Sequence, residues 1–94
     1  MSDLIDKAVE KLSAKVTTFD GSAKINIEGE GTIVLDHAGV RAGDEETDVT
    51  LTASAETFEG MMNGDVNPTM AFMSGKLKID GSMGQAMKLA SVLG

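Results

Sequence analysis

Short stretches in which apolar and polar residues alternate constrain the fold of this chain more than any other feature. Ala23, Ile25 and Ile27 alternate with polar neighbours, and Val49 and Leu51 follow the same pattern. A period of two is typical of a strand with one buried face. A sheet made of such strands keeps one face polar, so helices are expected on the other face only. The sequence therefore predicts an α+β fold of two layers, with a five-stranded, mainly antiparallel sheet covered on one face by helices.

The rest of the chain supplies helix signals around these strands. Ser54 and Asn67 each stand where a helix cap is expected, and Ser82 with Gln85 three residues later forms a capping-box pattern. With 94 residues the chain is expected to form one domain, residues 1–94. We expect helices over 3–16, 55–64, 68–74 and 82–93, and strands over 23–28, 32–36, 40–42, 49–53 and 76–80.

Charge and composition exclude several classes of function. Fifteen acidic against eight basic residues give a net charge of −7, which disfavours binding to nucleic acid. The chain has no cysteine, so it has neither a disulfide nor a thiolate nucleophile. No signal peptide and no apolar stretch long enough to span a bilayer is present, so a cytoplasmic location is expected.

Acidic and histidine residues offer little support for catalysis. His37 is the only histidine, and its neighbour Asp36 would point to the opposite side of a strand. Counting from Asp44, the sixth and twelfth positions of a calcium loop hold Val49 and Ala55 instead of glycine and glutamate. We therefore expect no catalytic residue, no metal site and no cofactor, and we interpret the chain as a non-enzyme.

A stripe of lysines lies on the first expected helix. Lys7, Lys11 and Lys15 recur at every fourth position and so share one exposed face of the helix. A solvated face explains such a stripe, and docking to anionic lipid headgroups is the alternative.

Methionine is concentrated in the last third of the chain. Six of the seven methionines and two of the three phenylalanines fall between Phe58 and Leu93, on three successive helices. Methionine often fills irregular gaps in an ordinary core, and that interpretation stays open here. Its unbranched, polarizable side chain also suits the wall of a cavity for flexible apolar ligands.

The same segment resembles a known family. The sequence from Asn67-Pro68 through Ala71-Phe72-Met73-Ser74-Gly75-Lys76-Leu77-Lys78-Ile79-Asp80-Gly81, together with Phe58-x-x-Met61-Met62-Asn63-Gly64 before it and Met83-Gly84-x-Ala86-Met87-Lys88-Leu89 after it, is similar to the sterol carrier protein type 2 (SCP-2-like) lipid-binding domain. Asp48-Val49-Thr50-Leu51-Thr52 resembles the strand that precedes these helices in that family.

The resemblance implies an apolar tunnel between sheet and helices. It implies non-enzymatic binding and transfer of fatty acids, acyl-CoA esters, sterols or phospholipids inside the cell. The partners it implies are a hydrophobic ligand, a transient contact with a membrane, and a biosynthetic enzyme; the alternative function is an accessory domain that presents a hydrophobic intermediate to such an enzyme. Carried over by position, the ligand-binding residues are Phe58, Met61, Met62, Phe72, Met73, Leu77, Ile79, Met83, Met87 and Leu89.

Overall fold

The computed structural model describes residues 3–15 and 19–93, and the order of its elements is the one expected from the sequence. Each boundary lies within one residue of the expected one; Val16, where the first helix was expected to end, lies outside the described residues. The helices are α1 (Asp3–Lys15), α2 (Ala55–Asn63), α3 (Pro68–Met73) and α4 (Met83–Leu93), and the strands are β1 (Ala23–Glu28), β2 (Gly31–Asp36), β3 (Gly39–Ala42), β4 (Val49–Ser54) and β5 (Leu77–Gly81).

The strands form one sheet in the order β3-β2-β1-β4-β5. The pairs β1–β2, β2–β3 and β4–β5 are antiparallel, whereas β1 and β4 are parallel. The expected mainly antiparallel sheet is thus confirmed. The central parallel pair is a feature that the sequence pattern did not predict, because periodicity shows which face of a strand is buried and not which strand lies beside it.

Rows of apolar residues run across one face of this sheet. Ile25 pairs with Ile33 on one side and with Leu51 on the other, and Leu51 pairs in turn with Ile79. The first three are buried and Ile79 is half-buried. This face carries the core, and burial along this row decreases at Ile79 on the β5 edge.

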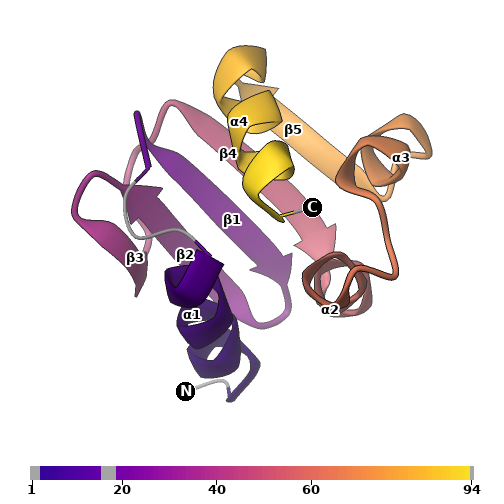
Figure 1. Cartoon of the computed structure of the whole chain (residues 1–94), viewed down its shortest axis with the longest axis horizontal. Helices are drawn as coiled ribbons and strands as arrows, with labels where there is room; N and C mark the ends of the chain where they lie inside the picture. Colours follow the sequence, from indigo (N-terminus) through magenta and orange to yellow (C-terminus); the bar gives the residue numbers. More distant parts are fainter. Residues whose placement is uncertain (1–2, 16–18, 94) are drawn as a thin grey trace.

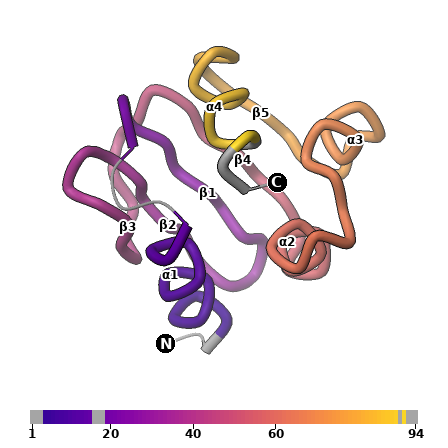
Figure 2. The backbone as a smooth tube through the Cα atoms, in the orientation of Figure 1, coloured from indigo at the N-terminus to yellow at the C-terminus, as the bar shows by residue number. Residues whose placement is uncertain are grey.

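The helices pack on that face. Figure 1 shows α1 and α4 lying over the sheet, with α2 beside the end of β4, while Figure 2 shows α3 beside the β5 edge and the α2–α3 connection running outside the sheet. Leu12 of α1, Phe58 of α2 and Leu89 of α4 belong to the same buried cluster as the sheet residues. The two-layer α+β architecture predicted from the sequence is confirmed.

The opposite, polar face of the sheet is crossed by the acidic loop after β3. The Lys24 ammonium forms an ion pair with Asp44 at 2.9 Å, and the Thr32 hydroxyl donates a hydrogen bond to the carbonyl oxygen of Gly43. Val34, which points to this face, is 1 % exposed and would contact a side chain placed at Gly43. The loop is therefore anchored along the sheet, although its acidic side chains at 44–46 remain exposed.

The helix caps agree with the sequence except at α4. The Ser54 hydroxyl accepts a hydrogen bond from the Thr57 amide, and the Asn67 side chain accepts from the amides of residues 69 and 70. Ser82 likewise accepts from the Gln85 amide at 3.3 Å. The returning half of the capping box is wrong, since the Ser82 amide donates to the carbonyl of Asp48 and the Gln85 side chain lies against Gly21.

Candidate functional site

The ten residues predicted to contact a ligand divide into two groups by burial. Phe58, Met61 and Met62 of α2 lie in the core, as do Leu77 of β5 and Leu89 of α4, each 8 % exposed or less. They pack within one cluster with the apolar face of the sheet. In this structure these five side chains hold the two layers together, and their contact with a ligand stays a prediction.

The second group is exposed. Phe72, Met73, Met83 and Met87 present large apolar surface to solvent, with Ile79 of β5 half-buried between the helices that carry them. The exposed fractions are 41 % for Phe72, 76 % for Met73, 46 % for Met83 and 56 % for Met87. Continuous apolar patches are uncommon on the surface of a small protein and mark sites that meet a ligand or partner.

Local capping and packing explain why these four side chains are exposed. On α3 the buried positions are Pro68 and Ala71, so the residues that follow Ala71 turn away from the sheet. On α4 the buried positions are Ala86 and Leu89, while Met83 and Met87 are four residues apart and share a flank of the helix. The helices α3 and α4 contact each other and both contact β5. The four exposed side chains therefore lie on two adjoining helices, and we call them the methionine face.

Met70 is also exposed, at 64 %, but it belongs to a different surface. It lines an open hollow of about 410 Å³ together with Asp65, Ser74 and Lys76. Val66 and Ala71 also line this hollow, and Asp65 and Lys76 place charges of both signs at it.

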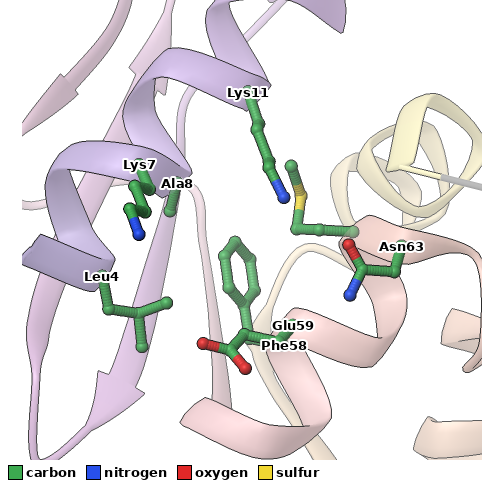
Figure 3. Close-up of a pocket in the computed structure, with 8 residues that line it drawn as sticks. Leu4, Lys7, Ala8, Lys11, Phe58, Glu59 and Asn63 are labelled. Carbon is green, nitrogen blue, oxygen red and sulfur yellow. The ribbon is translucent and has the colours of Figure 1, made fainter.

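A cleft between α1 and α2 contains residues that sequence reasoning did not assign to the site (Figure 3). Its volume is about 250 Å³, and Phe58 and Met62 of the predicted set form part of its apolar wall. The remaining residues come from both helices: Leu4, Lys7, Ala8 and Lys11 from α1, and Glu59 and Asn63 from α2. The only sequence signal for this cleft was the lysine stripe of α1, because the pairing of α1 with α2 is a tertiary contact.

The principal charge cluster of the described residues lies away from both surfaces. Arg41 donates hydrogen bonds to both carboxylate oxygens of Asp36, each at 3.0 Å, and to Glu45 at 2.8 Å. The hydrogen bond from Arg41 lowers the pKa of Asp36, and the bond from the Ala38 amide lowers it further. These contacts join β2, β3 and the following loop, so the cluster has a structural explanation.

A search of the described residues found no helix that is both long and apolar enough to cross a membrane. The same described residues contain no group of three or more histidine or acidic side chains that could hold a metal ion.

Comparison with known proteins identifies the family that has this architecture. Residues 2–94 match the model of the SCP-2 sterol transfer family, which is nearly the whole chain. The chain belongs to the SCP-2 sterol transfer family. The resemblance inferred from the sequence is thereby confirmed.

Relatives within the family include longer proteins. Hydroxysteroid dehydrogenase-like protein 2 from Xenopus tropicalis is 42 % identical over 98 residues, covering 94 % of this chain and 24 % of that protein. Sterol carrier protein 2 from Rattus norvegicus is 41 % identical over 64 residues, covering 68 % of this chain and 11 % of that protein. The chain thus spans about a quarter, or less, of the length of these SCP-2 relatives.

Among solved SCP-2 structures, palmitated SCP2L2 from Aedes aegypti superimposes with a TM-score of 0.80 at 25 % identity, covering 99 % of this chain and 95 % of that one. A crystal structure of Sterol Carrier Protein 2 Like 2 (SCP2-L2) from Aedes aegypti gives a TM-score of 0.79 at 24 % identity and covers 95 % of each chain. The agreement extends over both layers and so includes the helices that carry the methionine face.

Proposed function

We propose that this chain binds one lipid molecule in an apolar site between the sheet and helices α2, α3 and α4, and releases it chemically unchanged. The observation that carries the proposal is the methionine face, whose four large apolar side chains lie in solvent beside a fully formed core. A bound acyl chain or sterol would cover them. The palmitate held by a structural relative of 25 % identity supports a ligand of this class.

The energetics suit a carrier. Moving a chain of about sixteen carbons out of water gains on the order of 10 kcal/mol, at about 0.8 kcal/mol per methylene. Ordering and immobilising the ligand costs about 4–15 kcal/mol. Relative to a bilayer, in which the chain is already dry, the net gain is small, and a small net gain permits both loading and unloading.

Access to the site is expected to require movement of α2 and α3. The buried side chains of α2 fill the space next to the sheet, so a long ligand has to displace or extend that layer. The short α3 is joined to α2 by residues 64–67 at the β5 edge. Short helices with few buried side chains open at low free-energy cost. Hydrogen exchange with and without palmitate tests this step, and equal protection of both helices in the two samples would count against it.

The direct test of the proposed function is identification of the ligand. Protein purified without detergent should yield a lipid in organic extracts analysed by mass spectrometry, at a stoichiometry near one. Apo protein should then bind a fluorescent fatty-acid analogue that palmitate displaces. If extracts contain no lipid and acyl probes change neither fluorescence nor melting temperature, the proposal is wrong.

An accessory role is the second candidate, and the length of the relatives favours it. The matched region is about a quarter of proteins that include Hydroxysteroid dehydrogenase-like protein 2. In this version the chain presents a hydrophobic intermediate to a partner enzyme. A pull-down that recovers biosynthetic enzymes, from a chain that loses its lipid on dilution, would favour it over free transfer.

A further inference from the structure

The cleft between α1 and α2 combines an apolar wall with two cationic groups. Phe58 and Met62 on α2 and Ala8 on α1 are buried at 1 %, 8 % and 3 % exposure, and they form its interior side. Lys7 and Lys11 are four residues apart on α1 and line the exposed side. One surface of the cleft thus favours hydrocarbon and the other favours an anion.

These two lysines have no acidic partner within the part of the chain that the structure describes. Lys24, Arg41 and Lys88 each form an ion pair there, whereas Lys7 and Lys11 form none. Lys15, Lys76 and Lys78 form no ion pair there either, so what distinguishes Lys7 and Lys11 is that both line one cleft. On a chain of net charge −7, two ammonium groups at one cleft oppose the overall charge locally.

The cleft also contains one acid and one amide. In the view of Figure 3 the Lys11 ammonium lies on the Asn63 side of the Phe58 ring, and the Glu59 carboxylate lies on the Leu4 side. Two ammonium groups against one carboxylate leave the lining with a net charge of +1. The Asn63 amide adds a hydrogen-bond donor at the end reached by Lys11.

We propose that Lys7 and Lys11 bind the carboxylate of a single-chain fatty acid, with the adjoining part of its tail against Phe58 and Met62. The inference rests on the proposed lipid-binding function and adds to it a preference for anionic over neutral ligands. The volume of about 250 Å³ lies just below the range of about 300–1,000 Å³ typical of whole-ligand pockets. The cleft therefore fits a head group and the first carbons of the tail.

The remaining tail has an apolar route from this cleft. Phe58 and Met62 line the cleft and also belong to the core cluster that contacts the sheet. A shift of α2 of the kind described above would let the tail continue between the layers toward the methionine face. A sterol or fatty alcohol follows the same route without using the lysines.

The test compares charged and neutral ligands on matched variants. Lys7→Gln/Lys11→Gln removes both cations of the cleft, and Lys15→Gln/Lys78→Gln removes two exposed lysines outside it. Dissociation constants are measured by probe displacement at pH 8 for palmitate and for 1-hexadecanol, below their aggregation limits. Thermal melting of each variant shows that it folds.

For the cleft variant we expect palmitate affinity to fall about two- to thirtyfold, the range of two partly exposed charge pairs, and the loss to shrink at high salt. Hexadecanol affinity should stay within about twofold, and the control variant should match the wild type for both ligands. Lys7→Arg/Lys11→Arg should retain palmitate binding because the charge is kept.

Each of the following results would overturn the inference. Unchanged palmitate affinity in the cleft variant excludes a carboxylate site, and an equal loss of hexadecanol affinity shows that the lysines serve only packing. If the cleft variant binds palmitate normally but no longer co-sediments with phosphatidylcholine–phosphatidylserine vesicles, the lysines contact a membrane surface instead. If wild-type protein binds hexadecanol but not palmitate, the inference alone fails; if it binds neither, the proposed function fails with it.

Discussion

Replacing Met73 and Met87 by glutamine tests the methionine face while leaving the fold intact. Glutamine has nearly the length of methionine, so the change replaces apolar with polar surface. Met73 is 76 % and Met87 56 % exposed, so neither contributes much to the core. Changes at such exposed positions alter the free energy of unfolding by about 0.5 kcal/mol or less. The melting temperature should therefore hardly change.

Lipid affinity should respond much more strongly. Full burial of a methionine side chain is worth about 1.5–3 kcal/mol, and a ligand can cover only the part that is still exposed. Scaled by the exposed fraction, that leaves about 1–2 kcal/mol for each residue and about 2–4 kcal/mol for both if the ligand covers them well. The expected loss of affinity is about 30- to 700-fold, at about 1.4 kcal/mol per tenfold.

The assay is displacement of a fluorescent fatty-acid analogue by palmitate, with Met70→Gln as the matched control. Met70 lies on the same helix as Met73 and is 64 % exposed, but it lines the separate hollow bordered by Asp65 and Lys76. Its substitution should change palmitate affinity less than about threefold. If the double variant binds palmitate as the wild type does, or if Met70→Gln weakens binding equally, the methionine face is not the ligand surface.

Three further predictions concern stability and reactivity. A Cβ on Gly81 (φ +110°) would overlap the carbonyl oxygen of Asp48, whereas Gly64 (φ +85°) faces open space. Urea unfolding should therefore show a loss of stability of about 3 kcal/mol or more for Gly81→Ala and of only about 1 kcal/mol for Gly64→Ala. Equal losses would refute the steric argument. Because Arg41 lowers the pKa of Asp36, the stabilisation from the Asp36 carboxylate is present above about pH 4 and is lost as the pH falls through the lowered pKa. In an NMR titration, Arg41→Gln should raise the pKa of Asp36. An unchanged pKa would contradict the assignment. Under mild peroxide, peptide mapping should find sulfoxide on the four exposed methionines of α3 and α4 before the two buried methionines of α2. Palmitate should slow oxidation of the methionines on the methionine face. Faster oxidation of the α2 pair would contradict the burial pattern.

The elements of this fold were predictable because their signals are local. The alternation around Ile25 and Leu51 marks the buried face of each strand, and Ser54 and Asn67 begin their helices where the sequence predicts. The Gln85 side chain departs from the local pattern. It leaves the cap for the neighbourhood of Gly21, since the Ser82 amide already has a partner in the Asp48 carbonyl.

The candidate site was predictable in composition and only partly in arrangement. The sequence predicted ten ligand-binding residues, whose contact with a ligand stays a prediction. It gave no means of separating Phe58 from Met73, which are 1 % and 76 % exposed in the structure. Both methionines of α2 are buried, whereas those of α3 and α4 are exposed, so the difference depends on how each helix packs on the sheet. That packing is set by partners distant in sequence.

The sequence by itself determined the identity and order of the elements and the buried face of the strands, as well as the membership of the chain in a lipid-binding family. These properties follow from hydrophobic period, caps and motif residues, which act over a few positions. Tertiary structure alone decided that β1 and β4 lie parallel, that Lys7 and Lys11 meet Phe58 across a cleft, and that four apolar side chains stay in solvent. The reason is physical: many strands and helices have interchangeable apolar faces, and only the packing of all of them together selects one set of neighbours.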